Sequence, residues 1–189
     1  MSLAPVDWLI VGLGNPGPQY EGSPHNVGFD VAERLRARWE LGKPRSKYRG
    51  LITDGRVVLP NGGHDRITRV AILMPQTYMN DAGKSVGPAR GELHVEPDRL
   101  IVIHDEIDLP FGQIRSRVGG GLAGHNGLRS VKSALGTGDF QRVRVGVGRP
   151  PTTDPDRVAA YVLGKFKEPR EAVQALIDSA ADAVEQLLS

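Results

Sequence analysis

Histidine, asparagine and aspartate side chains recur in this chain just after stretches of apolar residues. These sites are Asn15 followed by His25-Asn26, then Met79-Asn80, His104-Asp105 and, after a glycine-rich stretch, His125-Asn126. The carboxyl ends of parallel strands meet along one edge of an open α/β sheet, where such folds build their sites. Histidine with a carboxylate supplies general-base chemistry, and side-chain amides can stabilise an oxyanion. The pattern therefore indicates a reaction site rather than packing.

His25 is the candidate base. It stands between Pro24 and Asn26 with no apolar face to pack on, and an ordinary histidine pKa of roughly 6.5 suits a base at neutral pH. Asp105 could fix its tautomer, as in hydrolytic triads, with water in place of the serine. Taken alone, His25 is explained equally well as an inert loop residue. His104, at the end of an apolar stretch, is expected to be a core histidine.

The glycine-rich stretch Gly119–Gly127 leaves backbone amides free at the predicted start of a helix. Such amides suit a phosphate or a peptide carbonyl, and His125 within the stretch could contact backbone or phosphate. A flexible loop is the alternative. Seven basic residues and one acid lie between Phe111 and Arg149, whereas five acids and one base follow from Glu168 onwards. A basic patch fits a polyanionic partner, although charge alone allows an ordinary solvated surface equally well.

Two other motifs fit known patterns but lack their context. Gly12–Gly17 matches the glycine spacing of a dinucleotide site, yet Pro16 and Pro18 stand where its helix should open. We expect a rigid turn that presents Asn15 instead. Gly83–Gly87 matches a nucleophile elbow around a serine, but no strand precedes it. No His-x-x-x-His pair or other helical metal-ligand motif is present.

The composition indicates a globular protein with one domain, residues 1–189. The absence of cysteine excludes disulfides, a thiolate nucleophile and cysteine-based metal sites, and it fits a reducing cytoplasm. No basic-then-apolar leader opens the chain and no apolar run approaches membrane-spanning length. We therefore expect a cytoplasmic protein.

Periodicity and turn signals predict an α/β fold, a single domain with a mixed, mostly parallel twisted sheet flanked by helices. Thr153-Asp154-Pro155 resembles a helix N-cap followed by a proline in the first turn. A hairpin is expected within residues 40–68, from short segments at 50–53 and 57–59 with turns at Asp54-Gly55 and Asn61–Gly63. The other predicted strands are about 6–13, 70–74, 100–103, 113–118 and 143–147, and the helices about 27–39, 81–93, 122–135 and 168–188.

In its order and spacing of motifs, the chain resembles bacterial-type peptidyl-tRNA hydrolase from Leu9 to about Phe166. The resemblance rests on Gly12–Gly17, Tyr20, His25-Asn26, Tyr78–Asn80, His104–Glu106, Asp108–Pro110, Gly124–Gly127 and Arg142–Gly146. It implies an enzyme that cleaves the ester between a peptide and the terminal ribose of tRNA, and so recycles tRNA from abortive translation. It implies no metal and no cofactor.

The resemblance also assigns roles. His25 would be the general base, Asp105 its orienting carboxylate and Asn80 the oxyanion donor. The substrate-binding residues would be Asn15, Tyr20, Asn26, Tyr78, Met79 and Asn126. Phosphates near the acceptor stem and 3′ end of tRNA would bind Arg115, Arg117, Arg144 and Arg149. We expect a monomer without membrane contact.

This chain departs from the family pattern at three places. Ala123 replaces the usual glycine, Pro24 stands where many members have arginine, and residues 150–156 contain no lysine. Arg149 or Arg157 could take the place of that lysine. Two alternatives stay open: an NAD(P)-dependent oxidoreductase built on the glycine motif, and a non-catalytic RNA-binding module of the same fold.

Overall fold

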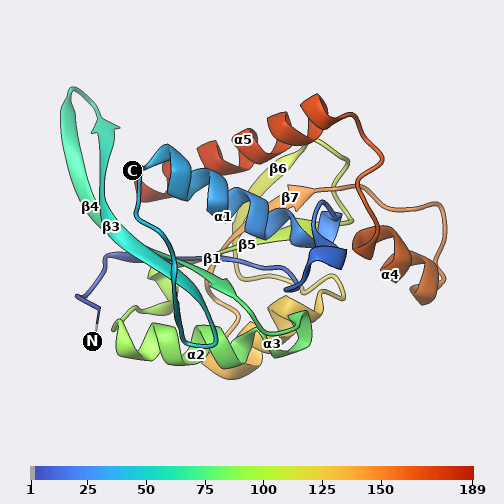
Figure 1. Cartoon of the computed structure of the whole chain (residues 1–189), viewed down its shortest axis with the longest axis horizontal. Helices are drawn as coiled ribbons and strands as arrows, with labels where there is room; N and C mark the ends of the chain where they lie inside the picture. Colours follow the sequence, from blue (N-terminus) through green and yellow to red (C-terminus); the bar gives the residue numbers. More distant parts are fainter. Residues whose placement is uncertain (1–2) are drawn as a thin grey trace.

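The computed structural model describes residues 3–189 and contains a seven-stranded sheet with helices on both faces (Figure 1). The strand order is β2-β3-β4-β1-β5-β7-β6. Its centre is parallel, because β1 pairs with β4 and β5, and β5 pairs with β7; the remaining pairs are antiparallel. This confirms the predicted α/β class and mixed sheet. The strands are β1 (Trp8–Gly12), β2 (Arg45–Lys47), β3 (Gly50–Asn61), β4 (His64–Pro75), β5 (Leu100–Glu106), β6 (Ile114–Val118) and β7 (Gln141–Gly146).

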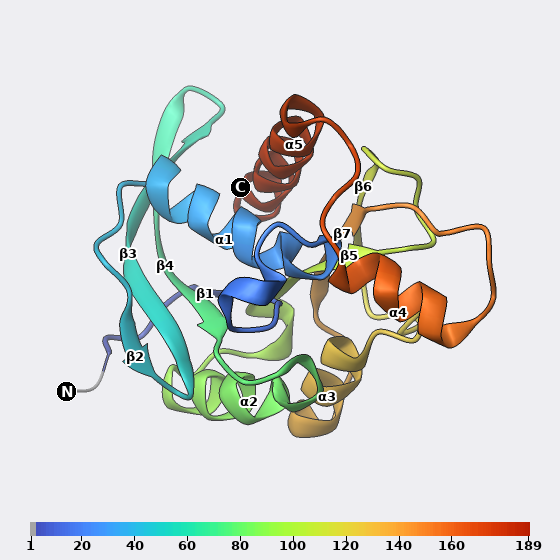
Figure 2. The same ribbon diagram turned by 45° about the vertical axis from the view of Figure 1, so that its right-hand side comes forward.

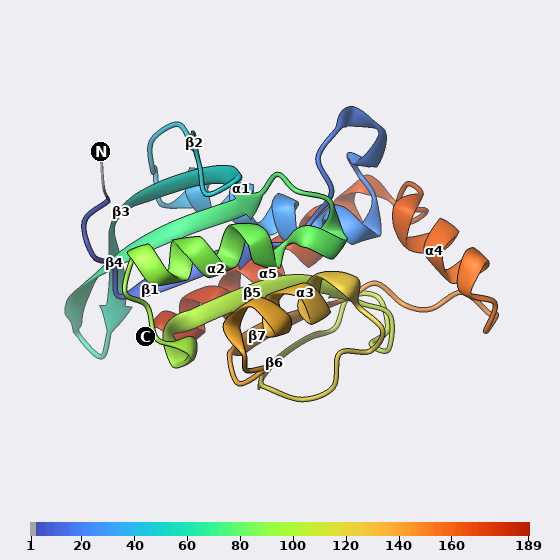
Figure 3. The same ribbon diagram turned by 90° about the horizontal axis from the view of Figure 1, so that it is seen from below.

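Two layers of helix cover the sheet. Helices α1 (Val27–Arg38) and α5 (Arg170–Leu188) lie on one face, and α2 (Gly83–Glu92) and α3 (Asn126–Leu135) lie on the other (Figure 3). Helix α4 (Pro155–Leu163) lies beside the sheet, next to the loop that precedes α1 (Figure 2). Short 3-10 turns occupy Pro18–Tyr20, Pro24–Asn26, Met79–Asp81 and Pro97–Arg99.

The core explains why the central strands read as unbroken apolar runs. Along β1, Trp8 and Ile10 pack towards α1 and α5, whereas Leu9 and Val11 pack towards α2 and α3. Strands buried on both faces need apolar residues at every position. The same holds for β5, which is buried from end to end.

The predicted hairpin is longer and simpler than expected. Strands β3 and β4 pair from Gly50↔Pro75 to Asn61↔His64, and Asp54-Gly55 lies inside β3 rather than in a turn. Asp54 holds Arg69 of β4 at 2.9 Å, which ties the two strands together at this point. A Cβ on Gly55 would lie 2.6 Å from the Leu41 side chain, so this glycine serves close packing. The chain reverses only at Gly62-Gly63, where both residues have positive φ.

Helix α3 begins at Asn126, not at the expected residue 122. Gly119, Gly120, Ala123 and Gly124 have φ of 65°, 97°, 48° and 71°, which is left-handed backbone that no α-helix contains. The glycines therefore form a loop, and the helix starts once the backbone returns to ordinary angles.

Among residues 3–189, no helix combines the length and apolar character needed to cross a bilayer.

Candidate active site

The site lies where β1 and β5 end and the loop before α1 crosses them. A Cβ on Gly12 would lie 2.2 Å from the Gly28 carbonyl oxygen, and one on Gly28 would lie 2.5 Å from the Leu13 nitrogen. Two glycines thus let α1 contact the end of β1 directly. The glycine motif serves this contact and the turn that follows, so the helix expected of a dinucleotide site does not form there. The result is that His25, just ahead of α1, faces the end of β5.

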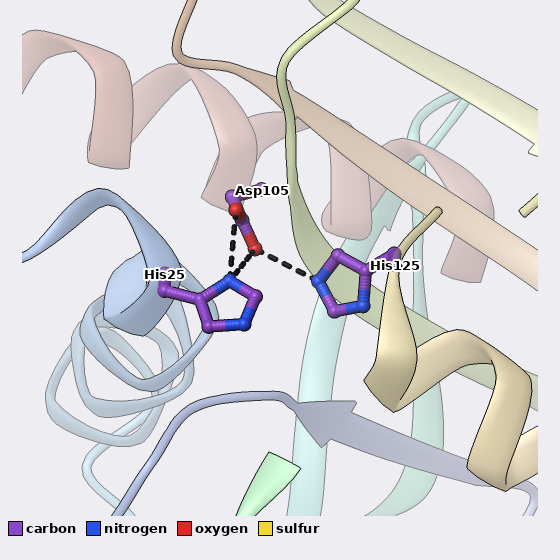
Figure 4. Close-up of side chains that lie close together, drawn as sticks. All are labelled: His25, Asp105 and His125. Carbon is purple, nitrogen blue, oxygen red and sulfur yellow. Dashed lines mark hydrogen bonds and ion pairs between the residues drawn. The ribbon is translucent and has the colours of Figure 1, made fainter. Parts of the chain in front are cut away.

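His25 and Asp105 form the centre of the site (Figure 4). His25 Nδ1 lies 3.0 Å from both carboxylate oxygens of Asp105. Nδ1–H donates to the carboxylate, which leaves Nε2 with a free lone pair directed away from Asp105. The side chain of His25 is 14% exposed and that of Asp105 is 3% exposed, so the imidazole alone opens to solvent.

Charge stabilises this pair. Burial lowers the pKa of His25, but the negative charge of Asp105 and its hydrogen bond raise it, and the net pKa lies above the usual value. Burial raises the pKa of Asp105, but His25 and His125 lower it further, and the net pKa falls far below the usual range. Asp105 is therefore an anion under His25, and His25 can take up a proton near neutral pH.

His125 is a third member of this group; its contact with backbone was one of the two expected of it, whereas its contact with Asp105 was not predicted. Its Nε2 lies 2.8 Å from Asp105 Oδ1, and its Nδ1 accepts hydrogen bonds from the backbone nitrogens of Gly127 at 3.1 Å and Leu128 at 3.3 Å. Histidine thus serves as the N-cap of α3. Because the helix was expected to begin at about residue 122, the sequence did not place His125 at a helix start, and ordinary capping preferences do not include histidine.

His25, Asp105 and His125 place potential ligand atoms within 4.8 Å of one another, close enough to surround a cation. However, Nδ1 of His125 accepts two backbone N–H groups, so the ring proton of the neutral ring must be on Nε2. Both nitrogens that face Asp105 are then hydrogen-bond donors. In this arrangement the donor set does not fit a metal ion.

His104 is a core histidine, as expected. It is 1% exposed, and its Nδ1 donates to the Asp105 backbone carbonyl at 2.8 Å. Burial lowers the pKa of His104 to about 3, so the ring carries no charge at neutral pH.

Asn15 and Asn26 hold each other through the backbone. Asn26 accepts from the Asn15 nitrogen at 2.8 Å and donates to the Asn15 carbonyl at 2.9 Å. Asn15 Oδ1 accepts from the Met79 nitrogen at 2.7 Å. Within the described part of the chain, Nδ2 of Asn15 makes no hydrogen bond, so of these two side chains it is the Asn15 amide that a ligand in the cleft can accept from. Asn26 itself is buried, and its side chain is hydrogen-bonded to the backbone of Asn15.

A cleft of about 620 Å³ opens over the His25–Asp105 pair. The structure brings most of the predicted site residues to it: Asn15, His25, Tyr78, Met79, Asn80, Asp105, Asn126 and Arg149. Tyr20 and Asn26 were expected to face the substrate, but they do not line this cleft. The opposite wall is apolar and was not predicted; it consists of Pro155, Val158, Ala159, Val162 and Leu163 of α4.

The predicted tRNA-binding arginines lie at the β6–β7 edge and the cleft mouth. Arg117 and Arg144 line a smaller cavity of about 250 Å³ beside the cleft, and Arg144 contacts Glu106 at 3.0 Å. Arg115 is exposed on β6 opposite Arg144. Arg149 lies at the cleft and pairs with Asp108 at 2.5 Å.

Arg142 was not predicted to have a role, and the structure gives it a structural one. It is 1% exposed and donates to the carbonyls of Gly121 and Gly138, each at 2.9 Å. Arg142 thus fastens the loop ahead of α3.

An α/β sheet that delivers a histidine, a buried carboxylate and several side-chain amides to one cleft defines an esterase-type hydrolase. Comparison with known proteins identifies the family of hydrolases to which the chain belongs. The model of the peptidyl-tRNA hydrolase family matches residues 9–189, and the chain belongs to that family.

Individual relatives and solved structures support the same family assignment. The peptidyl-tRNA hydrolase of Mycobacterium sp. (strain KMS) is 49% identical over 183 residues, covering 96% of this chain and 90% of that protein. That of Mycolicibacterium smegmatis is 46% identical over 184 residues, covering 96% and 91%. The crystal structure of peptidyl-tRNA hydrolase from Acinetobacter baumannii has a TM-score of 0.78 and 38% identity, covering 95% of this chain and 85% of that chain.

Proposed function

We propose that His25, oriented by Asp105, is the general base with which this peptidyl-tRNA hydrolase cleaves the ester between peptide and terminal ribose. The observation that carries the proposal is the buried Asp105 carboxylate bound to Nδ1 of His25, with Nε2 of the ring left free beside an amide-lined cleft. This is the arrangement that general-base activation of water requires.

The reaction then needs no covalent bond between the enzyme and the peptide. Nε2 of His25 takes a proton from water as the water oxygen attacks the ester carbonyl carbon. Asn80, an exposed residue at the cleft, donates to the oxyanion that forms, and one such donor can contribute about 3 kcal/mol to the transition state. The tetrahedral intermediate collapses, the ribose oxygen leaves with the proton from His25, and the products are a free peptide carboxylate and tRNA.

The amides around the base would hold the peptide. Nδ2 of Asn15 and the side chain of Asn126 lie at the cleft and can bind peptide backbone, which explains tolerance of many peptide sequences. Tyr78 and Met79 would contact the substrate as lining residues. Asn26 acts through Asn15, whose backbone it fixes. We assign Tyr20 no direct substrate contact, because it lies outside the cleft lining.

Arg115, Arg117, Arg144 and Arg149 would bind phosphates of the acceptor stem and 3′ end. The first three lie on the β6–β7 edge next to the cleft, so a phosphate backbone can follow them while the 3′ end reaches His25. Phosphate contacts position a nucleic acid without reading its sequence, which suits an enzyme that serves many tRNAs. We further propose that the chain acts as a monomer with a single domain.

The test is release of free tRNA from N-acetyl-aminoacyl-tRNA in the presence of EDTA. Wild type should turn over, His25→Ala should lose nearly all activity, and the binding variant Asn15→Ala should lose far less. Comparable losses of kcat/KM in the two variants would contradict the role of His25. Binding of tRNA by wild type without any turnover would instead favour a non-catalytic RNA-binding protein.

A further inference from the structure

His125 lies between the general base and the helix that carries Asn126. Its ring is buried, and its centroid lies 5.0 Å from that of His25 and 5.1 Å from that of His104. A Cβ on Gly127 would lie 3.0 Å from Cε1 of this ring and 2.4 Å from the Met79 sulfur. The ring is therefore held in a closely packed position, which only a glycine at 127 permits.

The hydrogen bonds of His125 leave it no freedom of tautomer. Nδ1 must be unprotonated to accept from the Gly127 and Leu128 nitrogens, so the ring proton is on Nε2 and points to Asp105 Oδ1. Moving the ring proton to Nδ1 would place a protonated nitrogen against two N–H donors. The cap of α3 thus dictates which nitrogen His125 offers to Asp105.

Asp105 accepts from two histidines at once. Both of its oxygens lie 3.0 Å from Nδ1 of His25, and Oδ1 also lies 2.8 Å from Nε2 of His125. Rotation of the carboxylate would therefore break the bond to His125. The hydrogen bond from His125 therefore fixes the plane of the Asp105 carboxylate, and the orientation of His25 depends on that plane.

We propose that His125 is a positioning residue for ester hydrolysis: its Nε2–H fixes the Asp105 carboxylate that orients His25, while its Nδ1 fixes the start of α3. One ring thereby joins the base to the helix end that bears Asn126, which also lines the cleft. This inference rests on the proposed function of His25.

Two substitutions separate the two contacts. His125→Asn keeps an acceptor for the helix N-terminus but is too short to reach Asp105. His125→Gln places its side-chain amide close to the former Nε2, so it keeps the donor to Asp105 and loses the cap. Steady-state hydrolysis of N-acetyl-aminoacyl-tRNA across pH, together with the Tm of each variant, measures both contacts.

We expect opposite outcomes. Because it keeps the cap, His125→Asn should lower Tm less than His125→Gln does, but it should lose about tenfold or more in kcat, because a loosened base is poorly aligned. Its acid limb of kcat/KM should also move to higher pH, since Asp105 without its second donor stabilises protonated His25 more strongly. His125→Gln should lower Tm while its acid limb stays at the wild-type position.

A merely structural role would give a different result: both variants would lose activity only in step with Tm, and neither acid limb would move. That outcome would overturn the inference. Full activity and an unmoved limb in His125→Asn would do the same. Parallel measurement of His25→Ala distinguishes a failure of the His125 proposal from a failure of the proposed function, because retained activity in His25→Ala would contradict the proposed function itself.

Discussion

At the scale of single residues, the site depends on which atoms are left unpaired. Asn15 uses its oxygen and backbone inside the protein and keeps Nδ2 for the cleft, whereas the oxygen and the nitrogen of the Asn26 side chain both bond to the Asn15 backbone. His25 keeps one nitrogen. Sequence identifies residue types at such sites, but it does not show which of their atoms the fold has already used.

Asn80 offers the first residue-scale prediction. Asn80→Ala should lower kcat about a hundredfold with little change in KM, because its donor acts on charge that develops only in the transition state. Steady-state kinetics on N-acetyl-aminoacyl-tRNA measures this. Asn61→Ala, on the distant hairpin, removes the same group and should leave both constants unchanged. A rise in KM alone for Asn80→Ala would assign this amide to substrate binding instead.

The charge of Asp105 sets the second prediction. Because Asp105 raises the pKa of His25, kcat/KM should fall with decreasing pH through a single ionisation above the usual histidine pKa. Asp105→Asn removes the charge, so the acid limb should move to lower pH, and kcat should fall by about 10³-fold or more as the ring loses its orientation. Asp98→Asn, at an exposed position in the 3-10 turn just before the same strand, is the matched control. An unmoved limb would mean that another group limits the rate at low pH.

At the scale of helices and strands, the sequence predicts most of what lies in the core. The central strands and helices α1 and α5 can be recognised in the sequence, because their buried positions must be apolar at fixed spacing. Only the N-cap of helix α4 can be recognised in the sequence. None of the helix residues is buried, and its apolar face lines the cleft instead of the core.

The contact of His125 with Asp105 could not be predicted for a related reason. It joins residues 20 apart through a ring nitrogen whose direction depends on where α3 begins. That start depends on left-handed angles at Ala123 and Gly124, and Ala123 is a residue that local preference would not place there.

The interface of α1 with α5 carries a third prediction. Asp30 lines a groove between these helices, and burial raises its pKa to about 6 against the opposing charge of Arg34. The unfolded chain releases this proton more readily, so stability contributed at low pH is lost as pH rises from about 4 to about 6. Asp30→Asn should therefore leave the free energy of unfolding unchanged at pH 4 and raise it by about 1–2 kcal/mol at pH 8. Denaturant unfolding at pH 4 and at pH 8 measures this. An equal gain in the free energy of unfolding at the two pH values would contradict a raised pKa of Asp30.

At the scale of the whole molecule, the net charge of +2 conceals the basic β6–β7 edge. If this edge binds tRNA phosphates, log KM should rise with log salt concentration, and Arg117→Ala should reduce that slope by about one. Arg56→Ala on β3, near the opposite edge of the sheet, removes an exposed arginine of equal charge. It should leave the slope unchanged, and a flat salt dependence of wild type would contradict this tRNA site.

The strand order has a consequence for synthesis of the chain. β1 is made before the other strands, but its partners in the sheet come from residues 70–73 and 100–103. The Arg34–Asp178 contact between α1 and α5 spans 144 residues, so the side of α1 that packs on α5 stays uncovered until α5 has emerged. Pairings this distant slow folding, because the loops between them must close first. Nascent chains of this protein therefore expose apolar surface for most of their translation, and His25 meets Asp105 only after more than half of the chain has been made.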